Sequence, residues 1–235
     1  MPRKKREFIE NGFYHIMTRG NDKRQIFFEE RDYRYFILLL KKYLKKYNIK
    51  MYNFAIMPNH FHLLISAEKK IELANYMKCV NLSYGTYFRK KYMSVGYLYQ
   101  GRYKSIIVEN NKYLLECARY IEYNPVKAGL IEKVEEYRWS SIRYYIFNEY
   151  KDLITENLVY SEIKKNNDKD FNDEYLNYVN NSKNEKRSEE RLFKEKIYGS
   201  LRFKKELEAN EIKSQWSHSG RPKKFRRNKE NEENK

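Results

Sequence analysis

The stretch that decides the fold is Met57-Pro58-Asn59-His60-Phe61-His62-Leu63-Leu64-Ile65, in which a Pro58-Asn59 turn joins two strand-like runs. It places two of the chain's four histidines one residue apart. In a β-strand, residues i and i+2 point to the same face, so the imidazoles of His60 and His62 should project together while Phe61 faces the other way. Two convergent imidazoles are the beginning of a divalent-metal site. A hydrogen-bonded pair of structural histidines is the alternative that this pattern leaves open.

The sequence on either side of this turn alternates between strand and helix patterns. We predict strands over residues 13–18, 51–57, 61–66 and 102–109, and helices over 36–47, 73–88 and 112–124. The third helix should end before Pro125, because a proline disfavours helical geometry at the residue that precedes it. The order β-α-β-β-α-β-α predicts an α+β protein with a ferredoxin-like split βαβ, one antiparallel sheet that carries the histidines, and one added helix.

The added helix carries a second group of candidate residues. At 100° per residue, its apolar positions between 114 and 121 form one core-facing stripe, and Tyr120 lies roughly 140° from the centre of that stripe. We therefore expect Tyr120 outside the core, with Asn124 one turn further along the same flank. A tyrosine beside a metal can attack phosphorus as its phenolate and remain covalently attached. The same Tyr-x-x-x-Asn spacing recurs at Tyr144 and Asn148, so spacing alone does not choose between them.

The charge of the chain points to a polyanionic partner. The formal net charge is +17 at pH 7 over 235 residues, and basic residues cluster at Arg3–Arg6, at Arg89–Lys91 and near the C-terminus. An AT-rich genome is the alternative source of so many lysines, although it would not cluster them. No apolar run approaches the roughly 18 residues of a membrane span, so we expect a cytoplasmic protein with no membrane partner.

Composition divides the chain into three expected parts. Residues 1–150 form the first domain, residues 151–174 a polar linker, and residues 175–235 a small helical, basic extension. Within the extension, helices over 187–198 and 200–213 around Gly199 outline a helix-turn-helix, and a helical hairpin that packs on the core is the alternative. The basic tail from Gly220 to Arg227 resembles the Gly-Arg-Pro core of an AT-hook but has Ser219 in place of the preceding arginine, so a solvated tail stays open.

Five motifs in the first domain resemble one known family. They are Arg19-Gly20-Asn21, MPNHFHLLI at 57–65, QGRYKS at 100–105, RYIEYNPVKAGL at 119–130 and YRWSS at 137–141. In this order and spacing they resemble the REP-associated tyrosine transposases, a branch of the single-tyrosine HUH transposases that also include compact insertion-sequence enzymes. The resemblance covers roughly residues 8 to 146.

The resemblance implies a role for each candidate residue. His60 and His62 match the paired metal-binding histidines, Asn124 matches the polar third ligand, and Tyr120 matches the nucleophile. The metal would be Mg²⁺ or Mn²⁺, and the activity that of a DNA endonuclease and transposase that cleaves and rejoins single-stranded DNA next to hairpins through a 5′-phosphotyrosine. Candidate DNA contacts are Arg19, Arg102, Lys104, Arg221, Lys223, Lys224, Arg226 and Arg227.

The partner implied by the resemblance is single-stranded or hairpin DNA in a bacterial cytoplasm, near the nucleoid. Two other functions stay open: a catalytically silent nucleic-acid-binding protein, and a metal phosphodiesterase that uses water as its nucleophile. A covalent protein–DNA adduct separates these alternatives. The sequence leaves open the DNA target, a mobile-element or domesticated role, a monomer or a homodimer, and whether Tyr120 acts in its own subunit.

Overall fold

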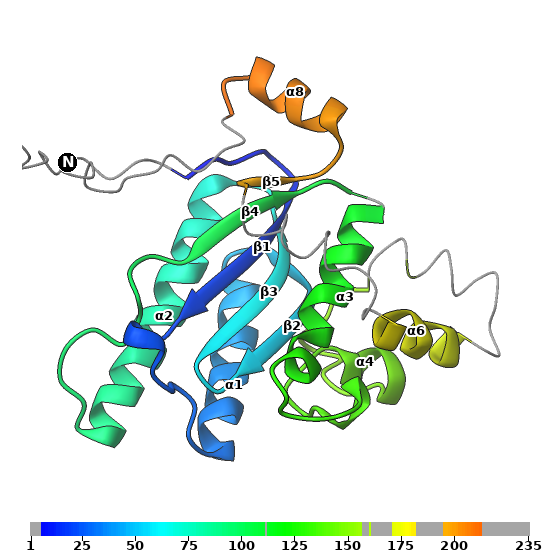
Figure 1. Ribbon diagram of the computed structural model, residues 1–235. Helices are drawn as coiled ribbons and strands as arrows, with labels where there is room; N and C mark the ends of the chain where they lie inside the picture. Colours follow the sequence, from blue (N-terminus) through cyan, green and yellow to red (C-terminus); the bar gives the residue numbers. More distant parts are fainter. Residues whose placement is uncertain (1–5, 111, 157–159, 161–170, 182–194, 213–235) are drawn as a thin grey trace, which may run out of the picture.

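The computed structural model describes residues 6–110, 112–156, 160, 171–181 and 195–212, and Figure 1 shows their arrangement. The first part of the chain runs β1 (Gly12–Arg19), α1 (Glu30–Lys46), β2 (Ile49–Met57), β3 (His60–Ala67), α2 (Lys70–Tyr92), β4 (Lys104–Val108) and α3 (Lys112–Lys127), with a short 3₁₀ helix η1 (Asn21–Lys23) after β1. Later elements are the 3₁₀ helix η2 (Val134–Glu136), α4 (Ile142–Phe147), α6 (Phe171–Asn180), β5 (Ile197–Tyr198) and α8 (Leu201–Ala209).

The sheet has the strand order β2-β3-β1-β4-β5. Each neighbouring pair among the first four strands is antiparallel, and β5 adds a short parallel edge beside β4. This confirms the predicted ferredoxin-like split βαβ with one added helix, and β5 extends it. In the β1–β3 pairing, Arg19 stands opposite His60 and Met17 opposite His62.

The two faces of the sheet are covered by different helices (Figure 1). On one face, Phe61, Leu63 and Ile65 of β3 pack into the main core, which the apolar sides of α1 and α2 complete. On the other face, Leu64 packs beneath α3. The period of two along β3 thus separates a large apolar core from the side that carries the histidines. Each large apolar side chain fully buried in this way stabilises the fold by about 1.5–3 kcal/mol.

Helix α3 does not end before Pro125, as the sequence predicted, but continues to Lys127. Proline removes one backbone donor, a small loss so close to the end of a helix. The chain leaves α3 through Gly129, which has a φ of 69°, and the Ala128 N–H donates to the Asn124 carbonyl at 2.9 Å. A glycine in the left-handed region is a common way to end a helix.

The C-terminal prediction is wrong at one point. Ile197 and Tyr198, expected as the end of a helix, form β5 and pair with Ile107 and Val108 of β4. Helix α8 does follow, capped by Ser200, whose Oγ accepts the Phe203 N–H at 3.1 Å. The described residues 195–209 therefore form a strand and a helix rather than a helix-turn-helix. Residues 187–194 and the basic tail lie outside the described residues.

Parts of the predicted linker and extension pack against the first domain. Tyr160 and Tyr175 are 1% and 5% exposed, and α6 contacts α3. The described part of the chain thus forms a continuous body, while the boundaries at 150 and 174 stay predictions. None of the described helices is both long enough and apolar enough to cross a membrane.

Candidate active site

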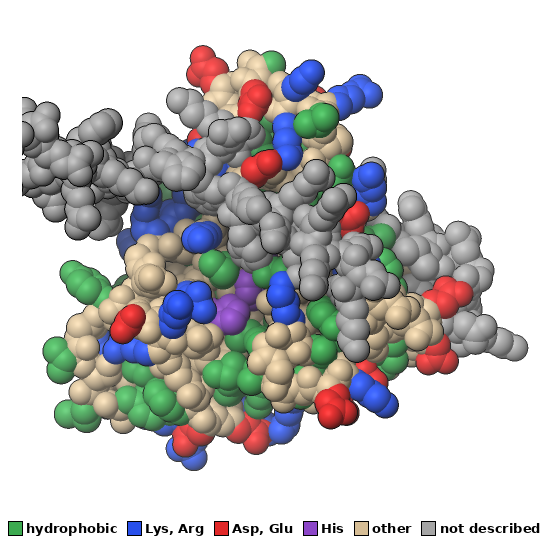
Figure 2. Space-filling model, viewed as in Figure 1, with side chains coloured by type: hydrophobic (Ala, Val, Ile, Leu, Met, Phe, Trp, Pro, Cys, Tyr) green, Lys and Arg blue, Asp and Glu red, His purple; other side chains and the backbone are tan. Residues whose placement is uncertain are grey.

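The histidine pair lies at the start of β3, directly after the Pro58-Asn59 turn. The rings of His60 and His62 lie 5.0 Å apart between centroids and nearly perpendicular, at 83°. Their Nδ1 atoms are each hydrogen-bonded, His60 to Oδ1 of Asn59 at 2.6 Å and His62 to Nε2 of His15 at 2.8 Å. In Figure 2, histidine side chains are visible in the middle of one face with Lys and Arg side chains around them.

His15 belongs to the site, and sequence reasoning missed it. It lies on β1 and points to the same face as His62, since Tyr14 and Ile16 beside it face the main core. The register places His62 opposite Met17, which makes His15 its diagonal neighbour across the strand pair. Alternation along residues 13–18 could have placed His15 on the face opposite Tyr14. Only the pairing of β1 with β3 brings it to His62.

All three imidazoles are held in the neutral form. Burial lowers the pKa of His15 to about 3. Burial, together with the positive charge of Arg19, lowers the pKa of His60 to about 4. The pKa of His62 lies well below its usual value because of burial first and the nearby His15, His60 and Arg19 second. Neutral imidazole is the form that binds a metal ion, so the site is ready for a ligand role near neutral pH.

Tyr120 is not outside the core, as its helical position suggested, but is only 8% exposed. Its ring packs at the histidines, with centroids 5.8 Å from His62 and 5.9 Å from His15. The expectation was wrong because it counted Leu115 among the core-facing positions. Tyr120 lies in one buried cluster with Leu64 and Ile106 of the sheet, whereas Leu115 packs against a separate cluster that contains Tyr175 of α6. The side of α3 that faces the sheet is therefore rotated toward Tyr120.

Asn124 and Lys127 follow Tyr120 along α3. The Asn124 side-chain N–H donates to the Tyr120 carbonyl at 2.7 Å, which directs the amide oxygen away from that contact. Lys127 Nζ lies 5.7 Å from the centroid of the Tyr120 ring and brings a positive charge to it. The competing Tyr144 instead packs edge-on against Tyr145 on α4. Tyr120 is thus the tyrosine that the fold brings to the histidine pair.

Helix α3 is fixed in place by a buried carboxyl group. Glu122 is fully buried and its Oε1 accepts from Asn53 of β2 at 2.9 Å and from Ser141 at 2.6 Å. The Tyr175 hydroxyl of α6 donates to the other carboxyl oxygen. Burial raises the pKa of Glu122 to about 7, against the opposing effect of these hydrogen bonds. The network joins α3 to the sheet and to α6, so it fixes the helix that carries Tyr120 and Asn124.

The Pro58-Asn59 turn before His60 is fixed by backbone hydrogen bonds from the segment that follows β1. The Pro58 carbonyl accepts the N–H groups of Ile26 and Phe27 at 2.8 and 3.0 Å, and the Asn59 carbonyl accepts the Gly20 N–H at 2.8 Å. Gly20 is required here because a Cβ would lie 2.2 Å from the Arg24 carbonyl oxygen. These contacts make residues 20–27 the support of the histidine turn.

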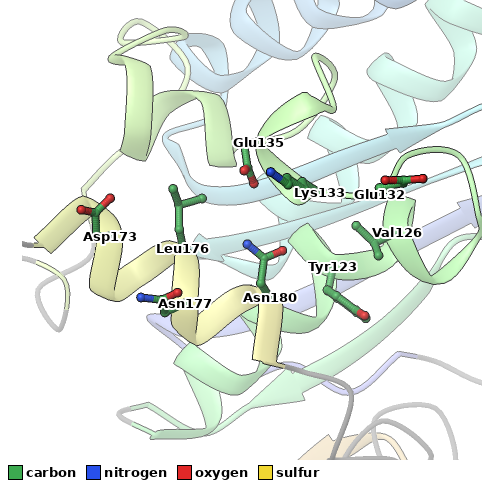
Figure 3. A pocket seen from close by; sticks show the side chains of 9 residues that line it. All are labelled: Tyr123, Val126, Glu132, Lys133, Glu135, Asp173, Leu176, Asn177 and Asn180. Carbon is green, nitrogen blue, oxygen red and sulfur yellow. The ribbon is translucent and has the colours of Figure 1, made fainter.

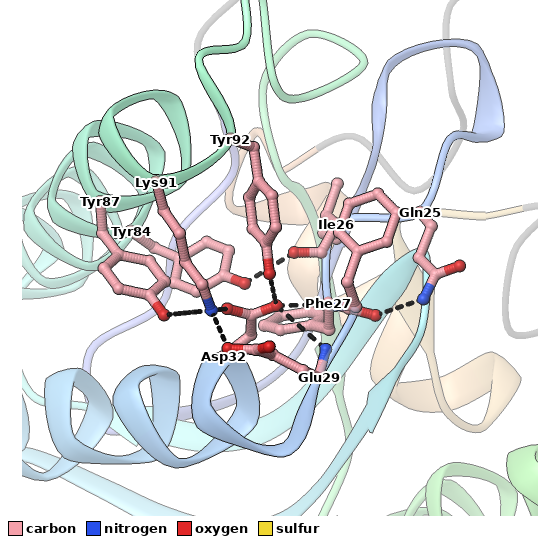
Figure 4. Close-up of polar contacts among 10 residues, drawn as sticks. Gln25, Ile26, Phe27, Glu29, Asp32, Tyr84, Tyr87, Lys91 and Tyr92 are labelled. Carbon is pink, nitrogen blue, oxygen red and sulfur yellow. Dashed lines mark hydrogen bonds and ion pairs between the residues drawn. The ribbon is translucent and has the colours of Figure 1, made fainter.

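The buried carboxylate of Asp32 fixes the chain directly after residues 20–27. Asp32 of α1 has a fully buried side chain and accepts the Phe28 N–H at 2.9 Å. It also accepts from Lys91, Tyr87 and Tyr92 near the end of α2, at 2.5, 2.9 and 2.6 Å (Figure 4). Burial alone would raise the pKa of Asp32, but these hydrogen bonds outweigh it and the pKa is lowered. The ionised carboxylate therefore joins α1, α2 and the segment that carries the turn.

The predicted DNA-contact residues divide into two sets. Arg19 is half-buried next to the histidines, and Arg102 and Lys104 are exposed at the start of β4. Arg221, Lys223, Lys224, Arg226 and Arg227 lie outside the described residues.

A cavity elsewhere in the protein is chemically different from the histidine site. About 530 Å³ in volume, it lies between the end of α3, η2 and α6 (Figure 3). Three carboxylates line it, those of Glu132, Glu135 and Asp173, against one lysine, Lys133. This balance of charge would repel phosphate groups, so the cavity does not suit a nucleic acid.

The donor set at the histidines fits a weakly bound divalent cation. No group of three or more His, Cys, Asp and Glu side chains within the described part of the chain is arranged as a metal site. Two convergent imidazoles nevertheless suit a divalent ion, and hydrogen-bonded Nδ1 atoms are the usual support of histidines that ligate through Nε2. Without a carboxylate ligand the affinity should be modest.

Fold and site together define a class: a split βαβ sheet with a His-x-His pair on a central strand and a tyrosine over it on the added helix. The family described as "Transposase IS200 like" matches residues 9–124, a range that contains all of these residues, and the chain belongs to this family. It is therefore a DNA-processing enzyme of the transposase type.

Solved structures extend the comparison of folds. A REP-associated tyrosine transposase bound to a REP hairpin is 16% identical, with a TM-score of 0.52 over 67% of this chain and 93% of that chain. A candidate transposase from Deinococcus radiodurans R1 is also 16% identical, with a TM-score of 0.36 over 46% of this chain and 88% of that chain. No curated protein matches the chain significantly. The first of these comparisons shows that the chain shares its fold with the REP-associated tyrosine transposase.

Proposed function

We propose that this protein cleaves and rejoins single-stranded DNA next to hairpins by transesterification at Tyr120. The observation that carries the proposal is the meeting of His60, His62 and Tyr120, which come from β3 and α3, with the rings of His62 and Tyr120 5.8 Å apart between centroids. The solved relative bound to a REP hairpin supports hairpin DNA as the partner.

His60, His62 and the amide oxygen of Asn124 would hold Mg²⁺ or Mn²⁺, which when bound supplies a Lewis acid for a phosphate oxygen. The chain's own residues do the rest. Tyr120 Oη loses its proton and attacks phosphorus, the bond from phosphorus to the 3′-oxygen breaks, and the 3′-oxygen leaves and takes up a proton. A 5′-phosphotyrosine and a free 3′-hydroxyl result.

Two cations of this chain assist the step. Lys127, whose Nζ lies 5.7 Å from the centroid of the Tyr120 ring, brings a positive charge beside the phosphate that Tyr120 attacks. Arg19, opposite His60 on β1, offers its guanidinium to the phosphate. Because the phosphotyrosine conserves the energy of the broken bond, a 3′-hydroxyl from another strand can reverse the step and join new ends without ATP.

The test is a covalent adduct on a denaturing gel, with a labelled hairpin oligonucleotide that carries single-stranded flanks. Tyr120→Phe should abolish cleavage and the adduct and leave DNA binding nearly intact. Tyr123→Phe and Tyr144→Phe are matched controls that should stay active, since neither ring contacts the histidines. An adduct formed by Tyr120→Phe would refute the assignment of the nucleophile. Cleavage without any adduct in the wild-type protein would favour water as the nucleophile, and binding without cleavage would favour a silent DNA-binding protein.

A further inference from the structure

A groove of about 760 Å³ is lined by residues of α2, of the chain that leads from α2 to β4, and of η1 after β1. Its lining includes Asn21, Asn81, Leu82, Arg89, Tyr97 and Arg102. Among the described residues that line it there are two arginines and no carboxylate. The groove therefore suits an anionic ligand that also has apolar surface.

The groove is joined by backbone hydrogen bonds to the turn that carries His60. The Asn21 N–H donates to the Leu98 carbonyl at 2.8 Å, and the Gln100 N–H donates to the Arg19 carbonyl at 2.9 Å. Between those two positions, Gly20 donates to the Asn59 carbonyl at 2.8 Å. The end of β1 thus joins the backbone that lines the groove to the turn that carries His60.

The walls of the groove offer the surfaces that an unpaired nucleotide requires. Tyr97 is 86% exposed and Leu82 is 58% exposed, so the apolar surface of both side chains is open to a flat ligand. Arg24 donates to the Tyr97 carbonyl at 2.7 Å, which fixes the loop that presents this ring. A base that stacks on a tyrosine is a sequence-tolerant contact that contributes strongly to binding of single strands.

Polar groups in the same groove match the rest of a nucleotide. Arg89 is exposed on α2, and Arg102 is exposed at the far wall, where both can meet phosphates. Asn21 and Asn81 carry amides, which can donate and accept at the edge of a base.

We propose that this groove binds an unpaired nucleotide of the DNA strand whose phosphate lies at His60, His62 and Tyr120. The base stacks on Tyr97 and Leu82, its edge meets the two asparagines, and its phosphates meet Arg89 and Arg102. The inference rests on the proposed function and adds to it a place that holds the strand beside the reacting phosphate. Paired bases are stacked within a duplex and cannot enter in this way, so the groove selects single-stranded DNA.

The first experiment measures binding of a labelled single-stranded oligothymidylate by fluorescence anisotropy, in EDTA so that no cleavage occurs. Tyr97→Ala should weaken binding by about tenfold. Arg89→Ala should weaken it and reduce the slope of log affinity against log salt by about 0.7. Matched controls are Phe147→Ala, an exposed aromatic on α4, and Arg202→Ala, an exposed arginine on α8, neither of which lines the groove. Equal binding by Tyr97→Ala and Phe147→Ala would overturn the proposal.

The second experiment places the base. In a hairpin oligonucleotide with single-stranded flanks, each unpaired base is replaced in turn by an abasic site. One position should weaken binding to the wild-type protein and have no further effect in Tyr97→Ala, because the same contact is already lost. Additive losses at every position would show that no base lies on Tyr97. The proposal would also be overturned if Tyr97→Ala weakened binding of duplex DNA as much as binding of single-stranded DNA.

These results separate the groove from the chemistry. An adduct at Tyr120 with unchanged binding by the groove variants would refute the groove and leave the proposed function standing. If the groove variants lose binding as expected but the wild-type protein forms no adduct, the chemistry is refuted and the groove stands. Because the Tyr97 side chain is exposed, Tyr97→Ala should keep the unfolding temperature of the wild-type protein, which excludes a loss of fold as the cause.

Discussion

His15 and His62 are 47 residues apart in the chain, yet Nε2 of His15 lies 2.8 Å from Nδ1 of His62. The contact exists because β1 and β3 are antiparallel neighbours and the two residues are diagonal on the face that α3 covers. A hydrogen bond at Nδ1 fixes the tautomer and the orientation of an imidazole that ligates through Nε2. His15 is thus a positioning residue for the proposed metal ligand.

His15→Ala should weaken Mn²⁺ binding by about 10- to 100-fold, because His62 loses the partner that orients it. Titration calorimetry with Mn²⁺ measures the change without any DNA. His15→Gln, whose amide can restore a hydrogen bond to His62, should recover part of the affinity. If His15→Ala bound Mn²⁺ as tightly as the wild-type protein, the contact would be a packing contact alone.

Removal of the metal should stop the reaction. EDTA should abolish cleavage of the hairpin oligonucleotide, and Mg²⁺ or Mn²⁺ should restore it. His60→Ala and His62→Ala should be inactive with either ion, whereas Asn124→Ala should be less severe, since water can replace one weak ligand. His218, which lies beyond the family match and outside the described residues, offers the matched control, and His218→Ala should keep its activity. Full activity of His62→Ala would be incompatible with the proposed site.

Asp32→Asn should lower the free energy of unfolding at pH 7 by about 2–3 kcal/mol, because a charged acceptor is lost from several buried hydrogen bonds. The folded state lowers the pKa of Asp32, so its contribution is present above the unfolded pKa of about 4 and is lost as the pH falls through the folded pKa. The difference between the two proteins should therefore be constant from pH 7 to about 5 and shrink below about pH 4.

Urea unfolding at several pH values measures this difference. Glu30→Gln is the matched control on the same helix, since its ion pairs with Arg34 and Arg138 are exposed and screened by solvent. It should change stability far less than Asp32→Asn. If the difference in free energy of unfolding between the wild-type protein and Asp32→Asn widened toward acid pH, the carboxylate would not be the stabilising form.

Deletion of residues 217–235 should weaken DNA binding at low salt. The segment 220–229 contains six Lys or Arg and no acidic residue, so its contribution should be mainly counterion release. Each phosphate contact removed should reduce the slope of log affinity against log salt by about 0.7 for single strands or about 0.9 for duplex. The position of cleavage should stay the same, because Tyr120 and the histidines lie in the first domain. An unchanged salt slope would show that the tail does not contact DNA.

The sequence by itself determined the local structure and the face of each strand. Alternation along 57–65 placed His60 and His62 on one face, and the order of strand and helix patterns gave the split βαβ, because period and chain order are local properties. The prediction for Ile197 and Tyr198 failed because β5 exists only through its pairing with β4, and a two-residue strand has no period of its own.

Tertiary structure alone decided which distant residues meet. His15 reaches His62 through strand pairing, and Tyr120 is buried at the histidines because it lies on the side of α3 that packs on the sheet. Helical angles taken from the sequence placed that side too near Leu115, which packs instead against the cluster that contains Tyr175 of α6, and so assigned Tyr120 to the exterior. Chemistry at this site depends on groups brought together by packing, and the packing of α3 on the sheet is a property of the whole fold.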